Sequence, residues 1–151
     1  IGPRLRIVAN FAVGTDNIDI AACKARGIAV SNTPDAVTDG TADCAVMLML
    51  AAARHLVRGD RFARSGVSGR TLVIVGAGRI GYATAMRMTG WGMKVLYVAR
   101  TAKPEFERSP VCAERVDLDE GMRRGDFISI HTPLTPETRG LIDARRLALC
   151  K

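Results

Sequence analysis

Short apolar runs alternate with turn residues along the chain, and this alternation predicts strands and helices in succession. At the start, the apolar residues 5–13 predict a buried strand, residues 16–26 have helical spacing, and residues 28–31 predict a second short strand. A strand, a helix and a strand in this order form a βαβ unit. The unit implies a parallel sheet whose faces are covered.

A long helical stretch follows, from residue 38 to about residue 64. Its first half is apolar on all sides, which predicts burial between two lobes or across a subunit interface. Its second half places four arginines on one face at helical spacing: Arg54, Arg58, Arg61 and Arg64. The small residues at 65–70 (SGVSGR) then indicate a boundary between two differently patterned halves.

The second half alternates strands and helices more regularly. Strands are predicted at 71–75, 94–99, 113–116 and 127–131, helices at 79–90, 118–124 and 143–151, and a polar loop at 100–110. This order predicts an α/β fold with a Rossmann-type doubly wound parallel sheet, which is incomplete here. The missing strands leave residues 127–130 as an apolar edge.

Composition narrows the class of protein. The chain has 151 residues, 48% of them apolar, and a net charge of +7, which suits an anionic partner of any kind. Aromatic residues make up 5%, too few for a base-stacking surface, and the longest apolar run (44–53) is too short to cross a bilayer. The four cysteines have no metal-ligand spacing. We therefore expect no metal, no membrane contact, and reduced thiols in a cytoplasmic protein.

A glycine loop carries the main chemical signal. Gly76, Gly78 and Gly81 fit the pattern GxGxxG, which alone is weak; here it directly follows an apolar strand and opens a helix. Gly76 permits a tight turn, Gly78 lets the backbone approach a pyrophosphate, and Gly81 lets the helix pack closely on the strand. The alternative is a glycine turn without a ligand. The context favours a dinucleotide site.

The next strand indicates which dinucleotide. NAD sites usually carry an acid about 20 residues after the loop, to bind the ribose 2′-hydroxyl. No acid occurs between Tyr82 and Pro104, and the strand ends in Arg100, followed by Lys103. Arg100 is suited to grip a 2′-phosphate, so NADP is the preferred cofactor and NAD the other option. The alternative is that Arg100 and Lys103 are solvated cations of a loop and do not bind the cofactor.

With the loop placed, the chain resembles the D-isomer-specific 2-hydroxyacid dehydrogenases nearly from end to end. Within that family it is most similar to the glyoxylate and hydroxypyruvate reductases. The segments that carry the resemblance are 8–9, 12–16, 32–34, 38–43, the glycine loop, 131–138 and 141–143.

The resemblance implies two lobes with the active site between them. Residues 1–40 would end a flavodoxin-like substrate lobe, 41–68 would form the interdomain helix and linker, and 69–151 would be the first half of the NAD(P)-binding domain. The family pattern assigns the substrate carboxylate to the backbone N–H groups of Val13 and Gly14. It assigns the cofactor to Thr41 (nicotinamide), Arg79 and Ile80 (pyrophosphate), Arg100 and Thr101 (2′-phosphate), and Pro133 and Thr138 (adenosine and ribose).

Two departures from the family pattern stand out. The catalytic Arg, Glu and His of the family lie on segments that would follow Lys151, so the chain is expected to be an inactive fragment without a catalytic residue of its own. The family also has a longer, Trp-containing stretch where this chain has residues 65–70. His131 is expected beside the cofactor rather than in proton transfer, and His55 as a packed residue in mid-helix.

The leading hypothesis is therefore an oxidoreductase that, as the intact and homodimeric protein, reduces a small 2-oxoacid such as glyoxylate or hydroxypyruvate with NAD(P)H. A second hypothesis is an NAD(P)H-sensing co-regulator of the same fold, which binds partners without turnover. Nucleic-acid binding by the arginine face is a third. We expect no nucleic-acid partner, because that face lacks interleaved aromatic residues and the context of a recognition helix.

Overall fold

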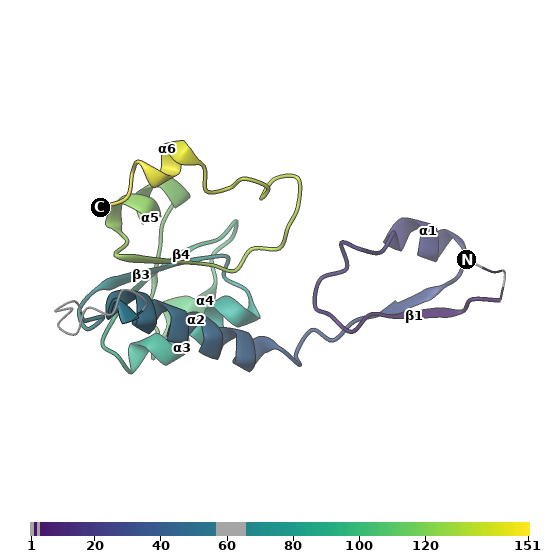
Figure 1. Cartoon of the computed structure of the whole chain (residues 1–151), viewed down its shortest axis with the longest axis horizontal. Coiled ribbons are helices and arrows are strands. Elements are labelled where there is room, and N and C mark those ends of the chain that lie inside the picture. The colour runs from purple at the N-terminus through teal and green to yellow at the C-terminus, as the bar shows by residue number, and fades with distance from the viewer. Residues whose placement is uncertain (1, 3, 57–65) are drawn as a thin grey trace. The chain divides into compact units, whose positions relative to one another are not determined.

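The computed structural model describes residues 2, 4–56 and 66–151, and it divides the chain into two compact units. The units are Ile1–Thr38 and Asp39–Lys151, and Figure 1 shows the elements of each, most of them labelled. The division falls after Thr38, near the predicted end of the substrate lobe at residue 40, and the predicted lobe assignments stay predictions. Val67, inside the predicted boundary at 65–70, is only 4% exposed and belongs to the core of the second unit.

The first unit is the predicted βαβ unit with shorter elements. Its elements are β1 (Ile7–Ala9), α1 (Ile20–Ala25) and β2 (Ala29–Ser31), and the two strands pair in parallel with Ile7 opposite Ala29. Helix α1 begins later than expected because Asp19 caps it: the Asp19 carboxylate accepts the N–H of Ala22 at 2.8 Å.

The expectation that the first strand is buried is wrong for this unit. Ile7 is 56% exposed, and only Val8 in the middle of β1 is half-buried. Two strands and one short helix cannot cover both faces of a sheet, so the apolar pattern of the strand is not matched by burial within the unit.

The second unit contains a four-stranded parallel sheet in the order β5-β4-β3-β6. The strands are β3 (Thr71–Val75), β4 (Lys94–Val98), β5 (Glu114–Arg115) and β6 (Phe127–Ile130). The helices are α2 (Thr38–Ala53), α3 (Arg79–Thr89), α4 (Pro104–Glu107), α5 (Leu118–Arg124) and α6 (Ala144–Leu147). Strand β6 is an edge strand, as predicted, and Ile130 at its end is 52% exposed.

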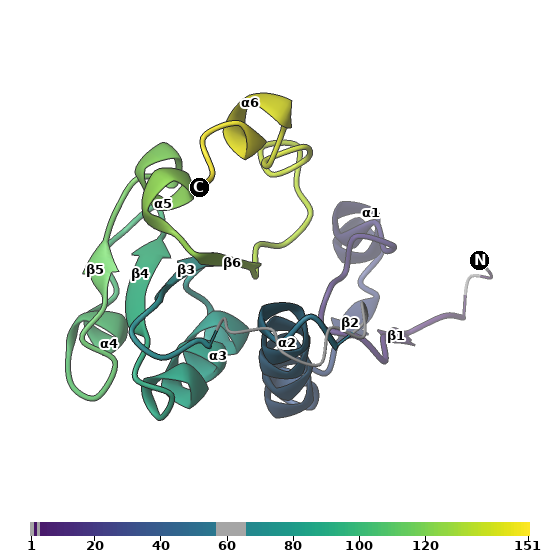
Figure 2. The ribbon, with the colours of Figure 1, turned by 60° about the vertical axis from the view of Figure 1, so that its left-hand side comes forward.

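Residues of β3 alternate between the two faces of the sheet, and each face has its own core. Leu72 and Ile74 pack with residues of α2, α3 and α4, whereas Val73 and Val75 pack in a second cluster beside α5. Figure 2 shows α3 and α5 on opposite sides of the sheet. This is the doubly wound Rossmann-type arrangement, and the carboxyl ends of the strands meet at one edge of it.

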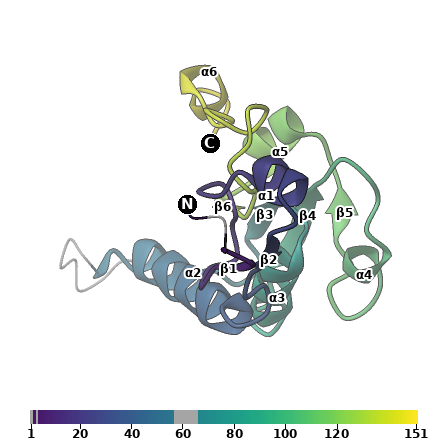
Figure 3. The same cartoon turned by 90° about the vertical axis from the view of Figure 1, so that its right-hand side faces the viewer.

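Helix α2 lies beside α3 on the same side of the sheet (Figure 3). The Arg87 guanidinium on α3 links the two helices, with Asp43 at 2.6 Å and Asp39 at 2.9 Å. The helix ends at Ala53 and not near residue 64, and His55 follows it with φ at +51°, so the mid-helix placement of His55 is wrong. Arg58, Arg61 and Arg64 lie outside the described residues.

The predicted loop at 100–110 contains a short helix that the sequence pattern did not indicate. Helix α4 begins with Pro104 in its first turn and buries Phe106 completely. The ring of Phe106 lies 5.0 Å from that of Tyr97 and 5.4 Å from that of Tyr82, measured between centroids. One buried aromatic residue thus converts a polar segment into an ordered element.

Candidate functional site

A pocket of about 630 Å³ opens at the carboxyl ends of β3, β4 and β6. This is the edge where doubly wound sheets bind ligands, and the volume lies in the range of cofactor sites. The glycine loop after β3, the loop after β4 and the segment after β6 supply most of the wall. Its lining is Val75, Gly76, Ala77, Gly78, Val98, Ala99, Arg100, Thr101, Lys103, Leu118, His131, Thr132, Pro133, Thr135, Glu137, Thr138 and Leu141.

Two glycines of the loop are required by the packing of the chain itself. Gly76 has φ at +101°, and a Cβ on it would lie 2.7 Å from the carbonyl carbon of His131. A Cβ on Gly81 would collide with the Gly76 carbonyl oxygen and approach Cγ2 of Ile74 to 2.9 Å. These contacts let α3 start close against β3, as expected from the pattern of the loop.

Gly78 is different, because nothing in the described part of the chain requires a glycine there. A Cβ on Gly78 would meet no atom within 4 Å, and its backbone (φ −95°, ψ −169°) is open to any residue. Gly78 also lines the pocket. A missing side chain at this point leaves room for a ligand against the backbone, which fits the close approach of a pyrophosphate.

The first turn of α3 also favours a bound phosphate. Gly78 is the N-cap residue and no side chain caps the helix. The backbone N–H groups of a helix start carry partial positive charge, and here they lie next to the pocket. This arrangement favours an anionic group such as a phosphate, so the residues present fit a dinucleotide.

The charges of the pocket are mainly positive at its β4 side. Arg100 and Lys103 are its two cations, and Glu137 is its single acid among the described residues. Hydrogen bonds from Thr135 and from its own backbone, with a smaller contribution from Arg100, hold the pKa of Glu137 below its ordinary value. Glu137 is therefore ionised at neutral pH, and the lining keeps one excess positive charge.

The segment after β6 is held by its own threonines. The Thr138 hydroxyl accepts the N–H of Thr135 at 2.8 Å and donates to the carbonyl oxygen of Pro133 at 2.5 Å. Thr138 lines the pocket, but its hydroxyl is engaged within the chain. It shapes the wall around Pro133 instead of offering a free hydroxyl group.

His131 lies at the end of β6 with its Nε2 atom 2.8 Å from the hydroxyl oxygen of Ser129. Burial lowers the pKa of His131 below its ordinary value, so the ring is neutral at pH 7. A neutral ring lacks the imidazolium proton that a general acid would give up. His131 lines the pocket, and its expected place beside the cofactor stays a prediction.

The structure brings six of the predicted cofactor residues to this pocket: Gly76, Gly78, Arg100, Thr101, Pro133 and Thr138. Arg79, Ile80 and Gly81 lie in the first turn of α3 and outside the lining, and Thr41 lies on α2. Sequence reasoning missed the apolar residues Leu118 and Leu141, which come from α5 and from the segment after β6. No local motif marks them, since they reach the pocket only through the packing of the sheet.

Val13 and Gly14 lie in the first unit, in the turn after β1. Two amide side chains hold this turn: Asn10 Nδ2 donates to the Gly14 carbonyl at 2.7 Å, and Asn32 Nδ2 donates to the Val13 carbonyl at 2.9 Å. Both carbonyl oxygens are therefore occupied within the unit. The side chains of Asn10 and Asn32 thus fix the shape of this turn.

The comparisons with known proteins decide the family. Residues 46–151 match the D-isomer specific 2-hydroxyacid dehydrogenase, NAD binding domain. The chain belongs to this family. The match covers the glycine loop, the β4 end and the segment after β6, so this part of the chain belongs to a domain that binds a nicotinamide cofactor. The fold and the family predicted from the sequence are confirmed.

Similar proteins include a glyoxylate reductase of Pyrococcus horikoshii, which is 49% identical over an alignment of 167 residues. The alignment covers 99% of this chain and 50% of that protein. Among solved structures, a glyoxylate reductase from Paecilomyes thermophila matches with a TM-score of 0.83 and 32% identity, over 100% of this chain and 49% of that one. A D-mandelate dehydrogenase from Rhodotorula graminis matches with a TM-score of 0.88 and 31% identity, over 100% and 50%. The chain thus spans about half the length of its relatives.

The described residues contain neither a candidate membrane span nor a candidate metal site. Within residues 2, 4–56 and 66–151, no helix is both long and apolar enough to cross a membrane. In the same part of the chain, no group of three or more His, Cys, Asp or Glu side chains could hold a metal ion.

Proposed function

We propose that this chain is part of an oxidoreductase that reduces a small 2-oxoacid, such as glyoxylate or hydroxypyruvate, to the D-2-hydroxyacid. The observation that carries the proposal is the 49% identity to a protein named glyoxylate reductase over 99% of the chain. The dinucleotide pocket, with its glycine loop and helix start, gives the family match a physical basis. The co-regulator hypothesis has no comparable support.

When bound, a nicotinamide would supply a hydride to the carbonyl carbon of the substrate, and the proton that completes the hydroxyl group would come from the catalytic His of the family pattern. The residues of this chain bind and orient. The backbone at Gly78 and the first turn of α3, with Arg79 and Ile80, hold the pyrophosphate, while Pro133 and Thr138 border the adenosine side. Thr41 faces the nicotinamide, and the N–H groups of Val13 and Gly14 receive the substrate carboxylate. Orientation of this kind accounts for much of the rate that such a site provides.

The proposed cofactor is NADP in preference to NAD. Arg100 and Lys103 line the pocket at the end of β4, with Thr101 between them. No acid occurs from Tyr82 to Pro104, so nothing on this strand repels a 2′-phosphate. A guanidinium at this point matches the paired oxygen atoms of a phosphate.

A turnover assay on the full-length protein that contains this chain tests the reaction. Oxidation of NADPH is followed at the nicotinamide absorbance with glyoxylate, hydroxypyruvate and pyruvate as substrates, and the chirality is determined for the products of hydroxypyruvate and pyruvate, since the product of glyoxylate is achiral. NADPH-dependent formation of the D-2-hydroxyacid is the expected result. Tight binding of NADPH with no turnover of any 2-oxoacid, and with a captured protein partner that responds to NADPH, would instead support the co-regulator.

We also propose a homodimer for the intact protein. The exposed apolar side chains on α2 support this, since Met47 is 59% and Leu48 60% exposed. Sedimentation of the full-length protein is expected to give twice the monomer mass, and replacement of both residues by Ser to shift it toward the monomer. A monomeric wild-type protein would refute this part of the proposal.

A further inference from the structure

The loop after β4, residues 99–103, carries the cations that face the pocket, and side chains from outside the pocket lining tie it down. Ala99, Arg100, Thr101 and Lys103 all line the pocket. The loop is short and partly exposed. Its conformation therefore depends on the groups that bind its backbone.

Arg115 on β5 binds the start of this loop. Its Nε and Nη2 atoms donate to the carbonyl oxygen of Ala99 at 3.2 and 3.0 Å, and Nη2 also donates to the carbonyl oxygen of Arg100 at 2.8 Å. One rigid guanidinium thus holds two successive carbonyl groups. Fixing both peptide groups fixes the direction in which the Arg100 side chain leaves the backbone.

The pairing of the strands explains why a side chain is needed here. Strands β4 and β5 pair only at Leu96 with Glu114 and at Tyr97 with Arg115. The backbone ladder between them stops before Ala99. Beyond the end of the ladder, the hydrogen bonds of the Arg115 side chain join β5 to the loop after β4.

The other end of the loop is bound by a buried phenol. The Tyr97 hydroxyl accepts the N–H of Lys103 at 2.9 Å and donates to the Glu107 carboxylate. Tyr97 is fully buried and stacks against Phe106. The loop is therefore held at both ends, but among the side chains that the structure describes only Arg115 binds the peptide groups on either side of Arg100.

We propose that Arg115 is a positioning residue for recognition of the 2′-phosphate, and that it sets the preference for NADP through the backbone of Ala99 and Arg100. The proposal rests on the proposed function, in which Arg100 binds that phosphate. Arg115 lies outside the pocket lining and its side chain is exposed, so its loss opens no cavity in the core. A change at Arg115 therefore acts on the loop more than on the stability of the fold.

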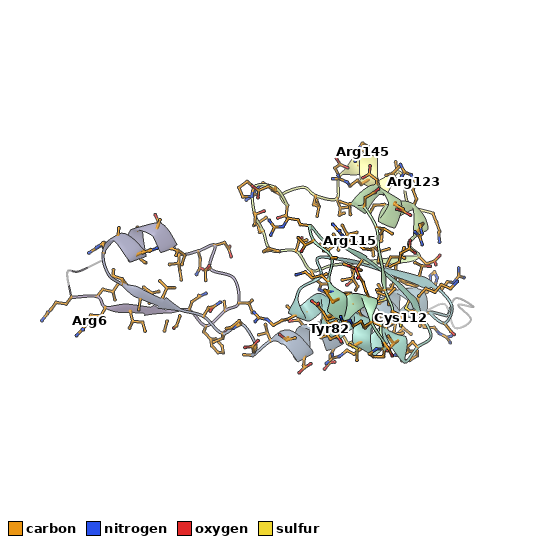
Figure 4. All side chains as sticks on the ribbon, turned by 180° about the vertical axis from the view of Figure 1, so that it is seen from behind. Arg6, Tyr82, Cys112, Arg115, Arg123 and Arg145 are labelled. Carbon is orange, nitrogen blue, oxygen red and sulfur yellow. The ribbon has the colours of Figure 1, made fainter. Side chains whose placement is uncertain are left out.

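The test compares Arg115→Met with Arg123→Met in the full-length protein. Arg123 is an exposed arginine at the end of α5, so the control removes the same charge away from the loop (both residues are labelled in Figure 4). Dissociation constants are measured by calorimetry for NADPH and NADH, and for the fragments 2′,5′-ADP and 5′-AMP. Thermal unfolding of each variant is recorded in parallel.

Arg115→Met is expected to raise the dissociation constants of NADPH and 2′,5′-ADP about tenfold, which corresponds to the loss of one charge-assisted hydrogen bond. The dissociation constants of NADH and 5′-AMP should change less than about twofold in this variant. Arg123→Met should leave all four dissociation constants unchanged. Arg115→Lys should recover only part of the loss, because an ammonium group restores the charge but not the paired hold on two carbonyl groups.

Equal weakening of NADPH and NADH would overturn the proposal, because a merely structural role affects both cofactors. Full recovery by Arg115→Lys would overturn it as well, since charge alone would then suffice. Arg100→Gln separates this proposal from the proposed function. If Arg100→Gln leaves the ratio of NADPH to NADH affinity unchanged, the 2′-phosphate assignment itself fails. If Arg100→Gln removes the preference for NADPH over NADH but Arg115→Met leaves that preference unchanged, only the proposed role of Arg115 is refuted.

Discussion

The glycine loop offers a test in which protein stability and cofactor binding respond to different residues. Gly81→Ala places a methyl group against the Gly76 carbonyl oxygen and 2.9 Å from Cγ2 of Ile74. One extra carbon in a tight core costs about 1–3 kcal/mol, so α3 must move or the fold must lose that stability. For a chain of this size, the unfolding temperature should fall by roughly 3–10 °C.

Gly78→Ala should show the opposite behaviour. Its new methyl group meets no atom within 4 Å and its backbone angles suit alanine, so the free energy of unfolding should change by less than about 0.5 kcal/mol. The methyl group would occupy the space that the pyrophosphate needs against the backbone. If the steric cost resembles that of an overpacked core, the dissociation constant rises by about 5- to 150-fold.

Thermal unfolding by circular dichroism and titration with NADPH by calorimetry measure the two quantities separately. Gly66→Ala is the matched control, because a Cβ at Gly66 also meets no atom within 4 Å and Gly66 lies outside the pocket lining. It should affect neither measurement. If Gly78→Ala bound NADPH as tightly as the wild type, the argument that the glycine loop holds the pyrophosphate would be refuted.

Three further predictions concern the core, the pH dependence and the substrate turn. Phe106→Ala should lower the free energy of unfolding by about 3–5 kcal/mol in urea titrations, because the ring is fully buried against Tyr97; a loss below about 1 kcal/mol would contradict the packing described. Hydrogen bonds from Arg145 and Arg146 of α6 lower the pKa of Asp119 to about 2. The stabilisation that the ionised Asp119 carboxylate gives by binding α6 is therefore complete above about pH 4 and is lost as the pH falls toward 2. Asp119→Asn should therefore unfold at a lower temperature than the wild type at pH 6, and a difference that persisted at pH 2 would count against the pairing. In the full-length protein, Asn32→Ala should raise KM for the 2-oxoacid about tenfold and leave NADPH affinity unchanged, because Asn32 holds the Val13 carbonyl; an unchanged KM would exclude this role.

The elements of the second unit with a strong local pattern could be predicted from the sequence. The predicted ranges of β3, α3, β4, α5 and β6 agree with the structure to within one residue at each end. Each of these elements has an apolar pattern of one clear period, and glycine or polar residues mark most of their ends. Such signals are local, so no knowledge of the tertiary structure is needed to read them.

The errors occurred where tertiary packing decides the structure. Helix α4 was missed because the segment after Pro104 is mostly polar, and its order depends on where Phe106 packs. Helix α2 stops at Ala53 although the helical pattern of the sequence continues beyond it. Strand β1 has the apolar pattern of a buried strand, yet Ile7 is exposed because its own unit has too few elements to cover it.

For the candidate site, sequence and structure supplied different parts. The glycine positions and Arg100 could be predicted, because their roles follow from the order of strand, turn and helix. The hold of Arg115 on Ala99 could not, since it depends on the register of β5 against β4 and on backbone carbonyl groups that the sequence does not distinguish. Supports of this kind become visible only in the folded chain.

The central claim is that this pocket binds a nicotinamide dinucleotide and prefers the one that carries a 2′-phosphate. Titration of the full-length wild-type protein with NADPH and with NADH, in the same buffer and by the same calorimetric assay, tests it most directly. We expect saturable binding of both cofactors, with the lower dissociation constant for NADPH. Tighter binding of NADH would contradict the assignment of Arg100 to the 2′-phosphate, and binding of neither would contradict the pocket itself.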